Sequence, residues 1–468
     1  MVFSSLLFIF VFLPVVLITY YISPKRYRNI VISIMSLIFY AWGEPVYIII
    51  MIFSTIFDYT NGRLIYKYKD NKRISKKILI FSITVNLGIL CFFKYYGFIV
   101  NNLNQVLGFS IKFTALPLPL GISFYTFQTM SYVIDVYKGL VPAQRSLVNF
   151  VTYVSMFPQL LAGPIVKYRD VEREIAERNE NIKLFGEGIE LFIIGMFKKV
   201  FIANNIGAIW SVIKIIPTEQ LAVLSAWLGI IAFTFQIYFD FSGYSDMAIG
   251  LGKMFGFNLP KNFNYPYTSK SITEFWRRWH MTLGGWFREY VYIPLGGNRE
   301  GKIKCYRNIF VVWLLTGLWH GANWNFILWG LYYGALVVLE KLFILKWLEG
   351  LPKIIRNLYS MVMIIIGWAL FEFEDLHKLF NFLGIMFGVN AKSLIDNVAI
   401  YYSYTNILMF IIALVCSTPI CNKISCKIKD KLRTSGIIIF SFIYMTMVFL
   451  CTAYLVNQSY NPFLYFRF

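Results

Sequence analysis

Continuous apolar segments, separated by short charged ones, recur from the first residues of the chain to the last. These segments do not alternate between apolar and polar at every second residue, which is the pattern of membrane-spanning strands. About 20 consecutive apolar residues are enough to cross a bilayer as a helix. The pattern therefore predicts an all-α polytopic membrane protein with roughly 10–12 transmembrane helices.

The basic residues predict the orientation of these helices. Because cytoplasmic loops are rich in Lys and Arg, we assign four basic clusters to the cytoplasm. These clusters lie at residues 25–28, 67–77, 261–307 and 423–433. The run 29–61 then crosses the membrane an even number of times, with a hinge at 43–45, and the N-terminus lies outside. Residues 1–22 are expected to be a retained first span, since no basic residue precedes them and no small-residue cleavage site follows.

Composition agrees with this class and excludes others. The chain is 58% hydrophobic and 15% charged, with a mean hydropathy of +0.61, whereas about a quarter of a soluble domain is charged. The net charge of +20 is distributed between apolar segments, which is typical of headgroup contacts and not of nucleic-acid binding. The six cysteines show no CxxC spacing, so neither a metal site nor a disulfide framework is indicated.

Two apolar regions are interrupted by polar residues or helix breakers. One break lies at 117–121, and another at 239–246 carries Asp240 and Asp246. Such breaks suit a protein that encloses a polar path through the bilayer. The carboxylates of Asp135, Asp240 and Asp246 are candidates for lining that path, although pairing with other groups is the safer interpretation.

A third interruption surrounds His320, one of only three histidines. From Asn308 to Leu318 is eleven residues, roughly 16 Å of helix, whereas the hydrocarbon core is about 30 Å thick. The polar stretch 317–325 therefore predicts a broken or re-entrant helix pair with His320 near the midplane. A single long tilted helix is the alternative.

His320 is the strongest candidate for chemistry. An ionisable side chain at membrane depth is costly and marks a functional site, and imidazole is well matched to proton transfer near neutral pH. Asn323 and Asn325 add polar groups to the same stretch. His377 lies in a charged turn and has no expected role.

The cytoplasmic stretch 261–307 holds the other candidates. Ser271 and Glu274 have the spacing of a capping box, and the aromatic residues that follow recur every three or four positions. This pattern predicts an amphipathic helix lying in the membrane interface, kinked at Gly284-Gly285. Its aromatic face favours interfacial anchoring over ligand binding. Its basic residues are either headgroup contacts or ligands of a phosphate-bearing substrate, namely Arg277, Arg278 and Arg288. His280, taken alone, is interpreted as structural.

Longer motifs resemble the bacterial membrane-bound O-acyltransferase family, and in particular its alginate O-acetyltransferase-like branch. They are residues 117–128 (PLPLGISFYTFQ), 157–165 (FPQLLAGPI), 236–250 (QIYFDFSGYSDMAIG), 262–267 (NFNYPY), 275–280 (FWRRWH), 286–299 (WFREYVYIPLGGNR) and 317–324 (GLWHGANW). The resemblance extends from the first span to about residue 341. One departure is the run 281–285, MTLGG, where the branch has a serine-rich run. That departure puts the local helix geometry in doubt.

The resemblance implies that His320 and His280 are the catalytic residues, with His280 the second histidine of the motif, on the cytoplasmic side of one reaction tunnel. The whole chain, 1–468, is then one membrane domain. It comprises N-terminal helices at 1–110, a catalytic core at 111–345 and C-terminal helices at 346–468. We expect the substrate-binding residues to be Trp276, Arg277, Arg278, Trp279, Arg288 and Asn323.

The function expected is O-acetylation of an extracellular or cell-wall polysaccharide by a bacterial enzyme of the cytoplasmic membrane, with no bound cofactor or metal. His320 would act as general base, and acetyl-coenzyme A would be the cytoplasmic acyl donor. An extracytoplasmic acetyltransferase partner protein, the polysaccharide machinery and membrane lipids are the expected partners. Two alternatives remain open: D-alanyl transfer to teichoic acid from a carrier protein, and a lipid-linked sugar transporter without enzymatic activity. A purely structural scaffold would leave the buried histidine unexplained.

Overall fold

The computed structural model describes residues 1–114, 116–457 and 463–464, and every regular element within them is a helix. Eight helices in this part of the chain are long and apolar enough to cross a membrane. They are Ile48–Lys67, Lys72–Leu107, Ile182–Ile213, Val223–Met254, Trp324–Glu349, Lys353–Glu372, Asn397–Cys416 and Ser435–Asn457. The predicted all-α polytopic fold is confirmed. The prediction of roughly 10–12 spans counted residues 1–22 as one of them. At that place the structure has an apolar helix, Phe8–Ile22, that is shorter than these eight.

The chain divides into two compact units. The first comprises Met1–Phe192 with Tyr244–Pro260, and the second comprises Ile193–Gly243 with Lys261–Phe468. The prediction of one membrane domain with three segments stays a prediction.

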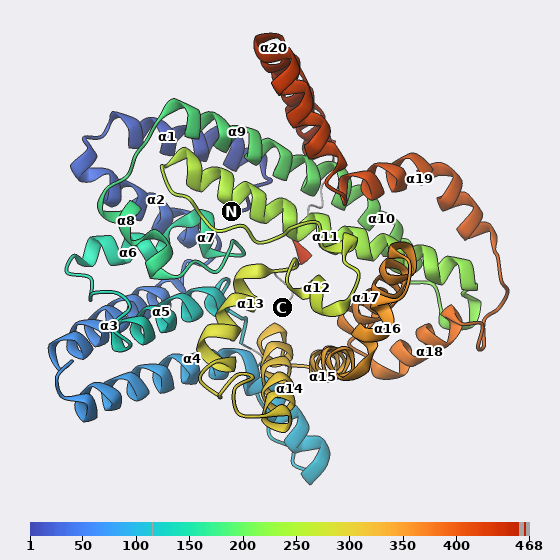
Figure 1. Ribbon diagram of the computed structural model, residues 1–468, viewed down its shortest axis with the longest axis horizontal. Helices are drawn as coiled ribbons and strands as arrows, with labels where there is room; N and C mark the ends of the chain where they lie inside the picture. The colour runs from blue at the N-terminus through green and yellow to red at the C-terminus, as the bar shows by residue number, and fades with distance from the viewer. Residues whose placement is uncertain (115, 458–462, 465–468) are drawn as a thin grey trace. The chain divides into compact units, whose positions relative to one another are not determined.

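The first unit consists of helices of very different lengths (Figure 1). Their bounds are α1 (Leu13–Ile22), α2 (Arg28–Gly43), α3 (Ile48–Lys67), α4 (Lys72–Leu107), α5 (Ile122–Tyr137), α6 (Leu147–Ser155), α7 (Phe157–Leu160) and α8 (Tyr168–Ala176), with parts of α9 (Ile182–Met196) and α11 (Val223–Met254). Helices α3, α4 and α5 pack side by side. The buried Asp58 carboxylate of α3 accepts hydrogen bonds from Ser82 (2.6 Å) and Asn86 (2.9 Å) on α4, so these helices are joined by polar groups as well as by packing.

The second unit holds the predicted site. Its elements are the remaining parts of α9 and α11, then η3 (Phe197–Ala203), α10 (Asn204–Ile213), α12 (Ile272–Trp276), α13 (Met281–Phe287), η6 (Arg288–Tyr292), α14 (Lys302–His320), α15 (Trp324–Leu339), η7 (Glu340–Ile344), α16 (Leu345–Glu349), α17 (Lys353–Glu372), α18 (Leu376–Met386), α19 (Asn397–Cys416) and α20 (Ile420–Asn457).

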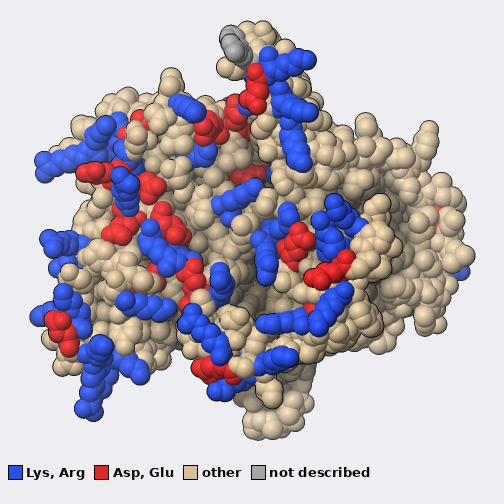
Figure 2. Space-filling model, viewed as in Figure 1, with Lys and Arg blue, Asp and Glu red and all other residues tan. Residues whose placement is uncertain are grey.

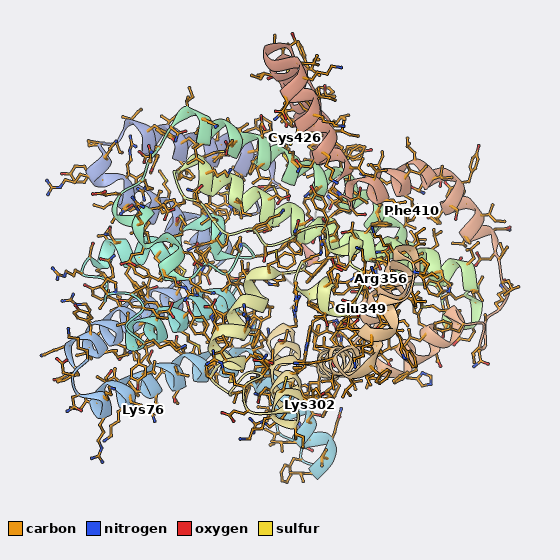
Figure 3. The ribbon with its side chains drawn as sticks, viewed as in Figure 1. Lys76, Lys302, Glu349, Arg356, Phe410 and Cys426 are labelled. Carbon is orange, nitrogen blue, oxygen red and sulfur yellow. The ribbon has the colours of Figure 1, made fainter. Side chains whose placement is uncertain are left out.

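Helices α14 and α15 form the predicted broken pair. Helix α14 begins at Lys302 (Figure 3), has 19 residues and ends at His320. Helix α15 begins at Trp324 and packs along α14, which excludes a single long helix through this region. A Cβ on Gly317 would lie 2.3 Å from the carbonyl oxygen of Phe326, and one on Gly330 would lie 2.4 Å from that of Trp313. Glycine at both positions therefore lets the two backbones come into contact.

The stretch 261–307 differs from its prediction in two respects. The stretch does not form one continuous helix, because α12 ends at Trp276 and α13 begins after a turn at His280. Helix α13 continues through Gly284 and Gly285, and the predicted kink there stays a prediction. The aromatic face is not an interfacial anchor either, because Phe275, Trp279 and Trp286 are at most 4% exposed and pack in the core. The capping prediction is confirmed in part. Ser271 Oγ accepts from the Glu274 N–H (3.0 Å), while the Glu274 carboxylate accepts from the Lys270 N–H instead of that of Ser271.

The outer surface of the second unit has the composition expected of helices that face lipid. On the face in Figure 2, the surface over α18 and α19 carries few charged side chains. Helix α19 exposes large apolar residues instead, among them Ile400, Ile407, Leu408, Ile411 and Leu414. The interior of a bilayer favours apolar side chains over polar and charged ones.

Candidate active site

His320 is the last residue of α14 and is enclosed by aromatic rings. Its side chain is 5% exposed. The rings of Trp329 and Phe371 approach it edge to face, with centroid distances of 4.9 and 5.3 Å, and Trp319 lies 5.1 Å away. Asn325, one turn before Trp329, donates to the Phe371 carbonyl (2.9 Å) and so fixes α17 against α15. The imidazole thus lies among aromatic rings, in a mainly apolar setting.

A small cavity of about 20 Å³ lies against His320. Besides His320 and Asp240, its walls are large apolar side chains, which are Ile237, Phe241, Trp279, Trp329, Trp368, Phe371 and Leu464. This volume holds about one water-sized group. A reacting carbonyl group would therefore be closely surrounded.

Asp240 brings a negative charge to this cavity, and its partners explain how it is tolerated. The carboxylate forms a buried ion pair with Lys199 on η3, and its Oδ2 accepts from the Leu464 N–H (2.8 Å). Both side chains of the ion pair are at most 3% exposed. An unpaired charge at such a position would destabilise the fold, and the ion pair with Lys199 removes this cost. The sequence interpretation of Asp240 as a paired carboxylate is confirmed.

His280 lies in the turn between α12 and α13, in a left-handed backbone conformation with φ 43°. This conformation costs about 1–2 kcal/mol for a residue with a Cβ. Asn262 supplies compensating bonds, since its backbone carbonyl accepts from the Met281 N–H (2.9 Å) and its side-chain oxygen from Thr282 Oγ1 (2.9 Å). Asn262 is fully buried, so the turn is fixed from inside the protein.

The same amide oxygen determines the tautomer of His280. Nδ1 of His280 lies 3.1 Å from Asn262 Oδ1, and because an amide oxygen only accepts, Nδ1 is the donor. The lone pair of the neutral ring then resides on Nε2. Burial lowers the pKa of His280 to about 3, so the ring is neutral at physiological pH.

A wider cleft of about 390 Å³ opens beside His280. Five of the predicted site residues line it, namely Trp276, Arg277, Trp279, His280 and Arg288. The side chains of Arg277 and Arg288 are exposed. The volume lies in the range of ligand-binding pockets, which are about 300–1,000 Å³. The cleft thus combines apolar walls with two cations at its surface.

Trp279 joins the two spaces, because it lines both the cleft and the small cavity. Its ring packs against Trp368 at a centroid distance of 4.7 Å and against Phe263 at 5.0 Å. The predicted pairing of His280 and His320 on one path is therefore compatible with the geometry, with Trp279 between them.

Two predicted residues are placed differently from the others. Arg278 donates from Nε and Nη2 to Glu274 (3.0 and 2.8 Å) and does not line the cleft, so its charge is already paired. Asn323 is the residue before α15, half-buried, and its side chain makes no capping bond. It lines neither the cleft nor the cavity.

Two residues of the site were not predicted from the sequence. Lys199 is one: it lies within the apolar span Ile182–Ile213, and its partner Asp240 is on another helix. Glu340 is the other: its buried carboxylate accepts from the Ile272 N–H (2.6 Å), the Thr273 N–H (2.8 Å) and Thr273 Oγ1 (2.6 Å), and thereby caps α12. A glutamate in an apolar run was the available signal.

Comparison with known proteins gives a consistent result. A sequence profile of the membrane-bound O-acyltransferase family matches residues 140–368. The chain is 42% identical over 403 residues to the probable alginate O-acetylase of Azotobacter vinelandii, which covers 85% of this chain and 80% of that protein. It is 36% identical over 429 residues to the peptidoglycan O-acetyltransferase of Helicobacter pylori, covering 84% and 81%. The teichoic acid D-alanyltransferase of Bacillus subtilis is 30% identical over 257 residues, covering 53% and 65%. The profile match includes both His280 and His320.

Proposed function

We propose, on the premise that the chain belongs to the membrane-bound O-acyltransferase family, that it supplies acetyl groups for O-acetylation of an extracellular or cell-wall polysaccharide. The protein is a multi-pass membrane O-acyltransferase. Relatives that match more than four fifths of the chain include a probable alginate O-acetylase and a peptidoglycan O-acetyltransferase, which supports acetyl as the group transferred. We place it in the bacterial cytoplasmic membrane.

The acyl donor we propose is acetyl-coenzyme A, bound from the cytoplasmic side. The exposed guanidinium groups of Arg277 and Arg288 at the mouth of the cleft suit its phosphates, since Arg pairs well with phosphate oxygens. The apolar cleft suits the pantetheine arm. Arg278 is a weaker candidate for phosphate contact, because Glu274 already neutralises it.

His320 is proposed as the general base. An acceptor hydroxyl is a weak nucleophile at neutral pH, and a base within hydrogen-bonding distance activates it. The hydroxyl oxygen attacks the thioester carbon, His320 takes the hydroxyl proton, the C–S bond breaks and the proton passes to the leaving sulfur. A positioned base contributes about 10²–10⁴-fold in rate.

His280 is proposed as a positioning residue on the donor side. Its neutral ring and its bond to Asn262 hold the turn that carries Trp279. The acceptor is proposed to be a serine of an extracytoplasmic partner protein that passes the acetyl group to the polymer.

The observation that carries this proposal is the enclosed His320 cavity, which shares Trp279 with a cleft bearing exposed arginines. D-alanyl transfer from a carrier protein remains the second candidate, although the D-alanyltransferase match covers about half of this chain. Purified protein in liposomes, given either labelled acetyl-coenzyme A or a D-alanyl carrier protein, separates the two. Acetyl transfer supports the proposal, and D-alanyl transfer alone overturns it.

A further inference from the structure

Trp329 lies on α15 beside His320, and the sequence did not single it out. The two ring centroids are 4.9 Å apart, and the ring planes are inclined at 80°. Trp329 is fully buried and lines the same small cavity as His320. Its indole Nε1–H has no acceptor among the residues that the structure describes.

A buried donor without an acceptor is an exception that requires a reason. More than about 90% of buried polar groups in proteins are hydrogen-bonded, and leaving one unpaired costs about 1–3 kcal/mol. An indole N–H can only donate, so no rearrangement within the ring satisfies it. The Trp329 Nε1–H lies beside the proposed base His320, so it can donate a hydrogen bond to an acceptor atom of the bound substrate.

The other lining residues do not offer an equivalent donor. Trp368 donates its Nε1–H to Tyr267 Oη (3.2 Å), and the Leu464 N–H donates to Asp240. Ile237, Phe241 and Phe371 have no polar side-chain atom. Of the three indoles that line the cavity, Trp329 is the one with a buried Nε1–H that lacks an acceptor among the described residues.

The reaction creates such an acceptor. When the hydroxyl oxygen attacks the thioester, the carbonyl oxygen gains negative charge before the C–S bond breaks. The cavity walls are mainly apolar, so that charge needs a nearby donor. Large apolar side chains surround this position, and a hydrogen bond in such an environment is stronger than in solvent.

We propose that the Trp329 Nε1–H donates a hydrogen bond to the thioester carbonyl oxygen of the acyl donor and stabilises it as it becomes an oxyanion. Trp329 is then a second catalytic residue beside His320. This inference rests on the proposed function, since it assumes a thioester donor at His320.

The test compares two Trp→Phe substitutions in the full-length protein reconstituted in liposomes with acetyl-coenzyme A. Trp329→Phe keeps an aromatic ring and removes the donor. Trp227→Phe is the matched control, because Trp227 also loses an indole bond, to the Met386 carbonyl (2.8 Å), away from both cavities. Loss of one oxyanion donor lowers kcat by about 10²–10³-fold. We expect this decrease for Trp329→Phe with the KM for the donor nearly unchanged, and we expect no decrease in kcat for Trp227→Phe.

A second substitution distinguishes the loss of the N–H from a loss of folding. Replacement of Trp329 by β-(3-benzothienyl)alanine preserves the shape of the indole and removes only the N–H, and the same decrease in kcat is expected. If kcat in this protein stays within about fivefold of wild type, or if only KM rises, the Trp329 assignment is wrong. In either case, wild-type protein that transfers acetyl leaves the proposed function standing, whereas wild-type protein inactive with every thioester donor overturns both.

Discussion

The ring of His280 lies 6.0 Å, centroid to centroid, from the ring of Trp319, the residue directly before His320. The two Trp-His pairs of the sequence therefore lie close together, although one is in the turn between α12 and α13 and the other is at the end of α14. This contact gives His280 an influence on the position of α14 through Trp319. Substitutions at the two histidines are consequently expected to differ in kind, with His320 affecting chemistry and His280 affecting the geometry around it.

Replacing His320 with alanine should abolish acetyl transfer while the protein remains folded, because the reaction loses its base. The loss expected from a general base is about 10²–10⁴-fold in kcat. Acetyl ester on surface polymer, measured by mass spectrometry, reports the loss in cells. His377→Ala is the control, since His377 is exposed on α18. Polymer that is acetylated normally in the His320 variant would contradict the role.

The stability contribution of His280 should depend on pH in a defined direction. The pKa is about 3 in the folded protein, while an unperturbed histidine has a pKa of about 6.5. The unfolded chain binds a proton first, so stability is present above about pH 6.5 and falls as the pH drops towards 3, by up to about 1.4 kcal/mol per unit. Thermal unfolding between pH 7.5 and 4.5 should show a shallower decrease for His280→Gln. Parallel curves for the two proteins would disagree with this assignment.

Arg277 and Arg278 should respond unequally to loss of charge. Arg277 is exposed at the cleft, whereas Arg278 is paired with Glu274. An exposed ion pair is worth about 0.2–1 kcal/mol, so Arg277→Gln should raise the KM for acetyl-coenzyme A by up to about fivefold. Arg278→Gln serves as the matched comparison and should change it less. The reverse order would place the donor phosphates near Arg278.

Gly330→Ala should displace α15 from α14. The added Cβ would meet the backbone carbonyl oxygen of Trp313 at 2.4 Å, and a backbone atom cannot move aside as a side chain can. Overpacking of this kind costs about 1–3 kcal/mol. Gly88→Ala provides the control, because nothing lies within 4 Å of its added Cβ. Equal unfolding temperatures for the two variants would show that the helix pair tolerates separation.

Substitutions of Lys199 and Asp240, the buried ion pair near His320, should have strongly non-additive effects on the free energy of unfolding. Asp240→Leu alone leaves Lys199 buried without a counter-charge, and breaking such a pair costs about 3–5 kcal/mol. The double replacement Lys199→Met with Asp240→Leu should regain much of this stability, since no charge is then buried. A double-mutant cycle of unfolding temperatures measures the coupling. Additive effects would mean that the two groups do not depend on each other.

Local sequence patterns predicted the local parts of this site. The break after His320 follows from Gly321 and from the polar residues around it, and Ser271 caps α12 as its spacing indicates. The turn at His280 was not predictable in this way. Its left-handed backbone is fixed by Asn262, eighteen residues away, and nothing at 277–280 excludes a continuous helix.

Contacts between distant segments account for the remaining differences. The aromatic face of α12 and α13 has the periodicity of an interfacial helix, yet Trp368 and Tyr267 cover it. The Lys199–Asp240 pair joins residues that are far apart in sequence, and a single sequence carries no signal for such pairing. Residue type and spacing thus identified which side chains matter, and tertiary packing decided which of them meet.

The carboxylate of Glu340 links the helix that follows His320 to the helix that precedes His280. Glu340 directly follows α15, which begins just after His320, and it holds the first turn of α12, whose five residues precede the His280 turn. Strain on either helix is thereby transmitted to the other through one side chain. The two histidines should consequently gain and lose their native environment in a single cooperative step, and partial unfolding that frees one of them while sparing the other should not be populated.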